Sequence, residues 1–504
     1  MTPIVLNAPS WGDLRHFLPE ATLAATFLAA LLADLLVRGR RPAVPFAVAL
    51  GGCLLSLALG VAGLPDAAHG ILGASVVVDG MAGFFRILFA FVAAVTILFS
   101  WASEEIMGSR RENKGEFYAL TALMAFGMCV MAEARDLIML YLSLELTSLS
   151  SYVMAGYMRT SLRSTEASLK YVIFGAVSSG IMLYGLSLLY GLTGATTFEG
   201  IRLALQHGRA DNFALLVVMI MVMAGMGYKI AAVPFHFWCP DVYEGAPTPV
   251  AALFSVGPKA AGFALMIRFF YTTLLAPGGA GLPGTLVGPA DWPLLVAVLS
   301  VVTMTYGNLV ALRQTNVKRL LAYSSIAHVG YLLMGFIMLT KAGLAAIMFY
   351  LLVYALMNLG AFLFVIALNN RLHSEEIDGY NGLGSRAPLA ALMMTIFLFS
   401  LTGLPPTAGF IGKFYLFAEV VNRQYFWLAV IGALNSVVSL FYYMKIARAM
   451  WLTAPREGAA GPLRLAPSHT AVLVLLGAPT LILGVYWSPL KALADRAISS
   501  FAGL

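Results

Sequence analysis

The chain consists of long runs of apolar residues separated by short polar segments. A helix needs roughly 20 apolar residues to cross a bilayer, and fourteen runs reach or approach that length. They lie at about 17–37, 43–64, 80–101, 116–133, 136–158, 166–193, 212–238, 247–275, 291–312, 318–340, 342–369, 387–421, 424–452 and 468–488. The linkers leave no room for a soluble domain. The pattern therefore predicts an all-α polytopic membrane protein, with residues 1–504 forming a single membrane domain of about fourteen transmembrane helices.

Composition supports this fold class and limits the chemistry. Of the 504 residues, 60% are hydrophobic and only 11% are charged, whereas an average soluble protein carries about 25% charged residues. The three cysteines form no C-x-x-C pair, and an iron–sulfur cluster needs about four thiolates. The sequence therefore predicts no cofactor and no metal in this chain.

The basic residues of the loops predict the orientation, because cytoplasmic loops carry the excess of Lys and Arg. One set of loops holds sixteen: Arg38, Arg40, Arg41, Arg110, Arg111, Lys114, Arg159, Arg163, Arg313, Lys318, Arg319, Arg371, Arg386, Arg448, Arg456 and Arg464. The opposite set holds eight: Arg15, Arg135, Arg202, Arg209, Lys341, Arg423, Lys491 and Arg496. The first set is predicted to be cytoplasmic, so both termini would lie on the outer side. These charges are spread over short loops, which favours a role in orientation over nucleic-acid binding.

Seven basic residues fall within the spans, and they are the starting point for function. They are Arg86, Lys170, Lys229, Lys259, Arg268, Lys413 and Lys445. A charge at mid-bilayer costs about 2.5–3.5 kcal/mol on insertion scales, so a deep charge is a functional hypothesis by default. Depth selects Lys229, Lys259 and Lys413, together with Glu145, the one carboxylate near the centre of a span.

The other charges are expected nearer to the ends of their spans. Arg86 and Arg268 lie within about two turns of a span end, where their side chains are expected to snorkel to the interface. Glu20, near the start of the first span, is expected at the interface as well. Lys170 is expected to form a surface salt bridge with Glu166 at spacing i, i+4.

Polar residues at helical spacing form stripes along several spans. Tyr141, Glu145, Ser148 and Tyr152 share one helix face because they are 4, 3 and 4 residues apart. Comparable stripes are Ser324, His328 and Tyr331; Tyr350, Tyr354 and Asn358; and Asn435, Ser439 and Tyr442. One stripe alone would indicate interhelical hydrogen bonding, worth about 0.6 kcal/mol per contact. Several stripes together with buried Lys and Glu indicate a hydrated polar path. For His328 a relay role and a structural role both stay open.

Two spans are predicted to break at proline. Pro234 lies in the seventh span, while Pro405 and Pro406 lie in the twelfth, next to glycines; proline removes a backbone donor and clashes with the preceding turn. Lys229 precedes the first break by five residues, and Lys413 follows Pro406 by seven. This reversed order is what an inverted repeat would produce. A single proline would be read as a kink, but two breaks with a lysine each favour a transport site.

The repeats divide the chain into four parts. Three N-terminal helices, 1–115, would precede a five-helix repeat, 116–275. A second, inverted five-helix repeat, 291–452, would follow, and a C-terminal helix, 453–504, would close the chain.

The pairing of Glu145 with Lys229 suggests a switch. Burial disfavours the charged form of a lysine, and a nearby carboxylate favours it. The separation of the two side chains would therefore control whether Lys229 holds a proton. Arginine could not serve in this place because it does not deprotonate in proteins.

Long segments of the chain resemble the antiporter-like membrane subunits of respiratory complex I, the type I NADH–quinone oxidoreductase. The segments are LSLELTSLSSYVMAGY, EASLKYVIFGAVSSG, AAVPFHFWCPDVYEGAPTPV, GPKAAGF, NLVALRQTNVKRLLAYSSIAHVGYLLMG and LTGLPPTAGFIGKFYLF. The resemblance spans essentially the whole chain. The resemblance implies fourteen helices with inverted five-helix repeats. It also implies that FMN, iron–sulfur clusters and the quinone site belong to partner subunits.

The resemblance further implies a role for each matching residue. Glu145 would be the carboxylate partner of Lys229, and Lys229 the proton site on the uptake side. Lys259 would be the central lysine and Lys413 the exit-side site. His328 would lie in the relay between these last two.

Three functions are compatible with these features. The first is a proton-translocating subunit of NADH–quinone oxidoreductase in the bacterial inner membrane, assembled with sibling membrane-arm subunits and coupled to quinone reduction elsewhere in the complex. The second is a subunit of a multi-subunit sodium–proton antiporter, which co-purification with antiporter subunits would reveal. The third is a passive membrane anchor that binds quinone or lipid, for which loss of Lys229 or Glu145 would leave proton pumping intact.

Overall fold

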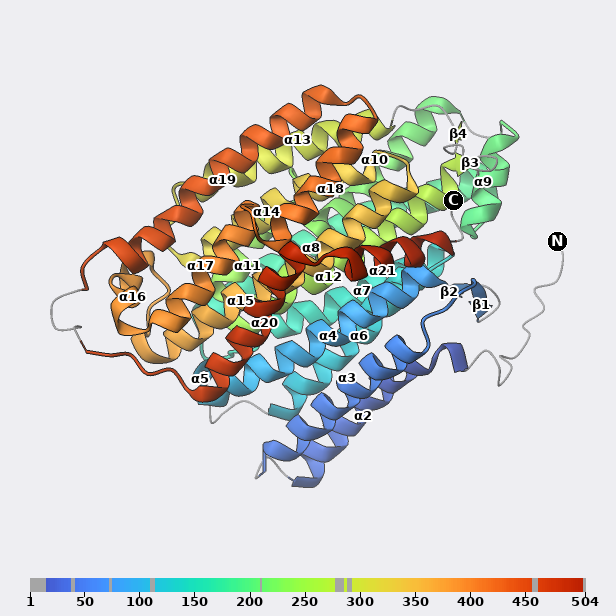
Figure 1. Ribbon diagram of the computed structural model, residues 1–504. Coiled ribbons are helices and arrows are strands. Elements are labelled where there is room, and N and C mark those ends of the chain that lie inside the picture. The colour runs from blue at the N-terminus through green and yellow to red at the C-terminus, as the bar shows by residue number, and fades with distance from the viewer. Residues whose placement is uncertain are drawn as a thin grey trace.

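The fold is a bundle of long helices whose axes are roughly aligned, as a computed structural model shows (Figure 1). The structure describes residues 15–37, 41–71, 75–108, 114–208, 211–276, 285–287, 292–455 and 461–501. Within these ranges, twelve helices are long and apolar enough to cross a membrane. The predicted fold class, an all-α multi-pass membrane protein, is confirmed.

The N-terminal part contains three long helices. They are α2 (Leu18–Val37), α3 (Ala43–Ala62) and α4 (Gly80–Ala102), followed by the short α5 (Glu104–Met107). Strands β1 (His69–Ile71) and β2 (Val76–Val78) form an antiparallel hairpin between α3 and α4. The carboxylate of Asp79 caps α4, because its Oδ1 accepts a hydrogen bond from the Ala82 amide at 2.9 Å.

The next two groups of helices follow the same order of elements. The first group is α6 (Lys114–Glu133), α7 (Leu137–Ala155), α8 (Leu162–Thr193), the short α9 (Phe198–Gln206), α10 (Asn212–Ile230), α11 (Trp238–Gly245) and α12 (Thr248–Thr273). The second group is α13 (Trp292–Ala311), α14 (Val317–Phe336), α15 (Lys341–Leu372), η1 (Ile377–Tyr380), α16 (Leu383–Arg386), α17 (Pro388–Thr402), α18 (Ala408–Asn422) and α19 (Phe426–Leu452). Between the groups, β3 (Leu275–Ala276) pairs with β4 (Thr285–Leu286).

The two groups match in two further respects. The third spanning helix of each, α8 and α15, has 32 residues. The fourth span of each is divided into two helices, α10 with α11 and α17 with α18. This order is what the predicted repeats would produce, and the inverted symmetry itself stays a prediction.

The chain ends with two helices where the apolar runs indicated one. Helix α20 (Pro467–Val485) is the predicted span, and α21 (Ser488–Ser499) follows it. Only 12 residues long, α21 carries Lys491, Asp495 and Arg496, so it lacks the apolar length that marks a span.

Both predicted breaks are interruptions of the helix. Helix α10 ends at Ile230, Ala231 adopts φ +60°, and the Val233–Pro234 bond is cis before α11 begins. Helix α17 ends at Thr402, Gly403 adopts φ +89°, and the Pro405–Pro406 bond is cis. Each break therefore ends one helix and begins another inside the bundle.

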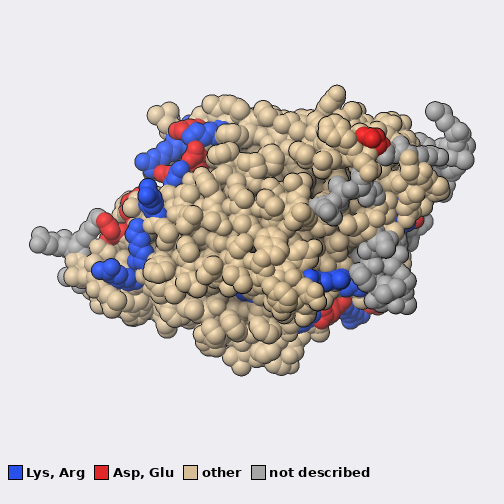
Figure 2. All heavy atoms as spheres, turned by 90° about the horizontal axis from the view of Figure 1, so that it is seen from above, with Lys and Arg blue, Asp and Glu red and all other residues tan. Residues whose placement is uncertain are grey.

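The distribution of charge and burial fits a bilayer environment. Figure 2 shows charged side chains gathered at the two ends of the molecule, with a broad uncharged band between them. Helix α12 lies at the centre and is buried along its apolar window, whereas α2, α8 and α19 expose many large apolar side chains. Lipid or neighbouring subunits can cover such outer faces. Six basic residues of the predicted orientation lie outside the described residues: Arg38, Arg40, Arg110, Arg111, Arg209 and Arg456.

The expectation that the side chains of Arg86 and Arg268 extend to water at the interface is wrong, and Glu20 is likewise buried inside the protein. All three are at most 2% exposed. Arg268 on α12 donates two hydrogen bonds to the carboxylate of Asp79, both at 2.8 Å. Arg86 on α4 forms ion pairs with Glu20 at 2.8 Å and with Glu133 at 3.0 Å. A carboxylate partner lies close to each guanidinium in the fold, so neither side chain needs to reach water.

The pair of Arg268 and Asp79 should be essential for stability. In Arg268→Ala the buried Asp79 carboxylate would lose the guanidinium that binds both of its oxygens, and breaking a buried pair in this way typically costs roughly 3–5 kcal/mol. We expect a large fall in the thermal stability of the assembled protein, measured by unfolding in detergent. The matched control is Arg135→Ala, which removes a partly exposed pair with Glu199 and should cost at most about 1 kcal/mol. Equal losses in the two variants would contradict this interpretation.

Candidate functional site

Lys229 lies in the last turn of α10, immediately before the first break. Its side chain is buried, and Nζ donates a hydrogen bond to Ser148 Oγ on α7 at 3.1 Å. The break is held by Trp238, whose Nε1 donates to the backbone carbonyl of Tyr228 at 3.0 Å. Because α10 ends here, the lysine lies within the bundle beside a helix end.

Glu145 lies one turn before Ser148 on the same face of α7. Its side chain is half-buried, and its Oε1 has no hydrogen-bond partner among the described residues. It forms no ion pair with Lys229, although the two groups are near enough to interact electrostatically. The structure therefore places the predicted partners on facing helices, with Lys229 bound to a neutral hydroxyl.

Lys259 lies at the centre of the bundle on α12. Its Nζ donates to Ser325 Oγ on α14 and lies 3.7 Å from Cys239 Sγ on α11. Gly262, one turn further along α12, lets α12 approach the first break closely. A Cβ at this position would be 2.6 Å from Ile230 and 3.5 Å from the Lys229 side chain. Lys229 and Lys259 are thereby held on neighbouring elements.

His328 on α14 lies between hydroxyl groups of two other helices. Its Nδ1 is 2.6 Å from Tyr350 Oη on α15, and its Nε2 is 3.2 Å from Tyr443 Oη on α19. Tyr443 also shares a hydrogen bond with Ser324. Both Lys259 and Lys413 are near enough to interact with this imidazole electrostatically.

Lys413 lies on α18 beside the second break. Its Nζ donates to the carbonyl oxygen of Thr402 at 2.8 Å and to Ser436 Oγ at 3.4 Å. It also lies 4.5 Å from the centre of the Tyr331 ring, within cation–π range. Thr402 is the last residue of α17, so the helix break supplies the carbonyl group that binds the ammonium group.

A polar network that the sequence analysis did not identify adjoins this end of the site. Asn308 on α13 donates to Tyr331 Oη at 3.3 Å and to Asn435 Oδ1 at 3.1 Å, and it accepts from Tyr442 at 3.0 Å. The stripes of α14 and α19 meet at this amide. An asparagine inside an apolar run was the available signal, but its partners come from separate spans.

The buried basic residues fall into two groups by their partners. Arg86, Arg268 and Lys318 each form an ion pair with a carboxylate within 3.0 Å. Lys229 and Lys413 contact hydroxyl or carbonyl groups and Lys259 a hydroxyl and a thiol, and none has a carboxylate partner among the described residues. The three lysines are therefore not held in the charged form by a fixed counter-ion, which is the condition for exchanging a proton.

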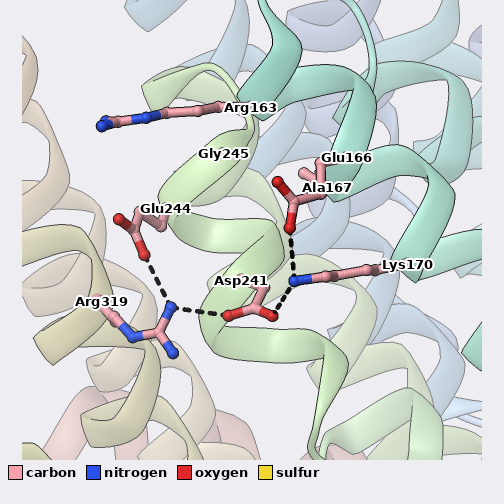
Figure 3. Close-up of a pocket in the computed structure, with 8 residues that line it drawn as sticks. All are labelled: Arg163, Glu166, Ala167, Lys170, Asp241, Glu244, Gly245 and Arg319. Atoms are coloured by element: carbon pink, nitrogen blue, oxygen red, sulfur yellow. Dashed lines mark hydrogen bonds and ion pairs between the residues drawn. The ribbon is translucent and has the colours of Figure 1, made fainter.

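A charged cluster lies at the end of the bundle where α8, α11 and α14 meet (Figure 3). It lines a cavity of about 210 Å³. Asp241 on α11 accepts from Lys170 on α8 and from Arg319 on α14, both at 2.7 Å. Arg319 also donates to Glu244 at 2.8 Å, and Lys170 forms the predicted pair with Glu166 at 2.7 Å.

This cluster attaches the short helix α11 to both of its neighbours. Burial alone would raise the pKa of Asp241. The hydrogen bonds from Lys170 and Arg319 lower the pKa by more than burial raises it, so the pKa lies below its ordinary value. Asp241 is thus ionised at neutral pH and keeps both contacts. The position of Cys239, and through it part of the Lys259 environment, depends on this attachment.

No metal site accompanies these residues within the part of the chain that the structure describes. Groups of three or more His, Cys, Asp or Glu side chains that could hold a metal ion do not occur there. The described site consists of side chains that can bind a proton and of hydroxyl groups that hydrogen-bond to them.

Comparison with known proteins agrees with this geometry. Residues 134–439 match a family described as "NADH:quinone oxidoreductase/Mrp antiporter, TM". The chain is 45% identical over 505 residues to NADH-quinone oxidoreductase subunit N of Anaeromyxobacter sp. (strain Fw109-5), with 97% of each chain covered. The chain belongs to the subunit N family of NADH-quinone oxidoreductases. In this chain the segment DVYEGAPTPV begins at Asp241 and leads into α12.

Solved structures support the same placement. A chain of respiratory complex I from Thermus thermophilus with bound aureothin is 30% identical, with a TM-score of 0.77, and the match covers 95% of this chain and 99% of that one. A chain of the Mrp complex from Dietzia sp. DQ12-45-1b has a TM-score of 0.83 over 96% of this chain and 97% of that one. At 21% identity the latter shows a shared fold only.

The second break should require glycine at position 403. In Gly403→Ala the residue would be forced into left-handed backbone at a cost of about 1–2 kcal/mol, and its Cβ would lie 2.9 Å from Lys413 Cδ. We expect lower stability together with impaired proton translocation, measured in membrane vesicles. The matched control is Gly194→Ala, another helix end at φ +70° with nothing within 4 Å of the added carbon. It should lose a similar stability and keep translocation; equal translocation in both variants would contradict the role of Gly403.

The attachment of α11 should weaken in Asp241→Asn. Two partly exposed ion pairs are lost, each worth about 0.2–1 kcal/mol, so we expect a loss of roughly 1 kcal/mol in thermal unfolding. Because the folded pKa is lowered, this stabilisation is present above about pH 4 and disappears as the pH falls through the folded value. The control is Glu166→Gln, which removes a pair within α8 only. An unfolding temperature that is the same in Asp241→Asn and in the unaltered protein would refute the attachment.

Proposed function

We propose that this chain is the proton-translocating membrane-arm subunit of a bacterial NADH–quinone oxidoreductase. The observation that carries this proposal is that three deep lysines, on three spans, have only neutral hydrogen-bond partners among the described residues. Such groups can release and regain a proton without breaking an ion pair. The identity to proteins named subunit N over nearly the whole chain supports the assignment of the complex.

In this proposal the proton path runs through the bundle from Lys229 to Lys413. Lys229 receives a proton on the uptake side, and Glu145 modulates it through their separation. Lys259 and His328 then relay the charge. Water molecules would bridge the intervals that exceed hydrogen-bond distance. The hydroxyl groups of Ser148 and Ser325 bind the ammonium groups along the way.

The two breaks have distinct uses in this path. Thr402 at the second break offers a carbonyl oxygen that Lys413 binds on the exit side. At the first break, α11 brings Cys239 close to Lys259. Interrupted backbone is tolerated at membrane depth where it is buried in protein or lines a hydrated cavity. Pro234, Pro405 and Pro406 would keep these interruptions in place.

The remaining parts of the reaction belong to partner subunits. FMN, iron–sulfur clusters and the quinone site would be carried by them, and quinone reduction there would drive the protons through this chain. The partners would include sibling antiporter-like subunits of the membrane arm, in the bacterial inner membrane, with both termini of this chain on the periplasmic side.

A subunit of a multi-subunit sodium–proton antiporter is the second candidate, because the Mrp chain has a closely similar fold. Purification in mild detergent distinguishes the two. Flavin and iron–sulfur proteins would accompany a complex I subunit, whereas antiporter subunits would accompany the alternative.

The relay should fail when a lysine can no longer release its proton. We expect Lys229→Ala and Lys413→Ala to lose most NADH-driven proton uptake in inverted membrane vesicles. Lys229→Arg should fail as well, because arginine keeps the charge but does not deprotonate. Uptake is followed with a pH-sensitive dye while NADH oxidation is recorded in parallel.

The matched control is Lys341→Ala, which removes an exposed lysine at the start of α15. It should pump normally. Normal pumping by Lys229→Arg would show that position 229 needs only a positive charge, and would overturn its part in proton transfer. Normal pumping by Lys229→Ala and Glu145→Ala would favour a passive anchor.

A further inference from the structure

Two carboxylates share a single guanidinium at one end of the N-terminal helices. Arg86 on α4 lies 2.8 Å from Glu20 Oε1 on α2 and 3.0 Å from Glu133 Oε1 on α6. Both glutamates are 0% exposed. This cluster lies outside the Lys229–Lys413 path and is built from helices α2, α4 and α6, which pack together (Figure 1).

The charges of this cluster do not balance if both glutamates are ionised. One guanidinium would then face two carboxylates, which leaves an uncompensated negative charge in the interior. The neighbouring Arg268 cannot supply the missing positive charge, because it is held by both oxygens of Asp79. Two carboxylates that share one site do not ionise together readily.

Two oxygen atoms of the carboxylate pair lack a hydrogen-bond donor among the described residues. Glu20 Oε2 and Glu133 Oε2 are buried and have no hydrogen-bond donor among the described residues. The two carboxyl groups nevertheless lie within hydrogen-bond reach of each other. A proton on one of them would complete a hydrogen bond between the two and would balance the charge of the cluster.

A cavity connects this cluster to the end of the bundle. Its volume is about 560 Å³, and Arg86 forms part of its lining. The rings of His16 and His69, which also line it, stack with centroids 4.1 Å apart. Arg86 Nη1 donates to the carbonyl oxygen of His16 at 3.3 Å. The cavity therefore offers water a route to the guanidinium, which both carboxylates contact.

The other titratable or charged groups around the cluster come from every element packed against it. They are His16 before α2, Cys53 on α3, Cys129 on α6, His69 on β1, Arg15 and Asp66 at the cavity, and the pair of Arg268 on α12 with Asp79. Asp66 is itself paired with Arg496 on α21. These contacts leave Glu20 and Glu133 as the groups that share Arg86.

We propose that Glu20 and Glu133 together bind one exchangeable proton, with Arg86 as the fixed counter-charge and the adjoining cavity as its route to water. The proton passes between a carboxylate oxygen of the pair and water that reaches Arg86 through the cavity, and no other bond changes. The site is a second proton-binding site of this chain, separate from the lysines. By the predicted orientation it lies at the periplasmic end.

Infrared difference spectroscopy of the whole resting complex tests this site directly. Spectra of the unaltered complex minus Glu20→Gln, and minus Glu133→Gln, should contain the C=O band of a protonated carboxyl group at neutral pH. Each single variant keeps one carboxylate for Arg86 and should assemble. The matched control is Glu199→Gln at a surface ion pair, which should remove carboxylate bands only. Absence of a protonated-carboxyl band from both glutamate difference spectra overturns the proposal.

Exchange with water is tested on the same band. Transfer to D₂O should shift it without unfolding, and Ala62→Leu, which places a larger side chain in the lining of the cavity, should slow the shift. A band that stays unshifted in the folded complex would show a trapped, structural proton and would overturn the exchange.

Should Glu133→Gln fail to assemble, Glu133→Asp keeps a carboxyl group and should move the band; an unmoved band also contradicts the proposal. Because the complex is at rest, these results are independent of the proposed lysine relay.

Discussion

A buried ammonium or guanidinium group must find hydrogen-bond acceptors, and the identity of its acceptors decides what it can do. Arg268 donates to both oxygens of Asp79, so its charge is balanced by a fixed carboxylate. Lys229 and Lys413 are bound by hydroxyl and carbonyl groups, which accept from the charged form without fixing it. The same low-dielectric interior thus contains guanidinium groups paired with carboxylates and lysines without such a partner among the described residues, and in the proposed relay the lysines exchange the proton.

The broken helices provide part of this distinction. In a continuous helix each carbonyl oxygen already accepts a hydrogen bond from the amide four residues on, whereas the last carbonyl groups of a helix lack that partner. At the end of α17 the carbonyl of Thr402 is free to bind Lys413, and Gly403 leaves space for the lysine stem. At the first break the corresponding carbonyl, that of Tyr228, is taken by Trp238, and Lys229 binds the hydroxyl of Ser148 instead. The two breaks therefore resemble each other in position and differ in their chemistry.

The charges at the two ends of the bundle have a different function. Asp241 bridges α8, α11 and α14 at one end, while Arg86 and Arg268 join α2, α4, α6 and α12 at the other. The proposed path from Lys229 to Lys413 lies between these ends, and its lysines form no ion pair with a carboxylate of the described residues. Ends joined by ion pairs and an interior of hydrogen-bonded polar groups are compatible with proton transfer, because hydroxyl and imidazole groups can reorient while the helices stay in place.

The sequence alone determined the class of the fold, the places of the spans and the depth of the critical charges. Apolar length specifies a spanning helix, and proline, accompanied by glycine at the second break only, indicates where the fourth span of each group breaks, since both effects are local. The stripe of Ser324, His328 and Tyr331 also followed from helical spacing. The ion-pair and hydrogen-bond partners of these charges did not follow from the sequence. Arg86 and Arg268 looked like interfacial residues because their carboxylates, Glu20, Glu133 and Asp79, come from other spans. Likewise, only the tertiary structure brought Ser325 to Lys259 and Thr402 to Lys413, because hydrogen bonds between helices depend on which faces pack together.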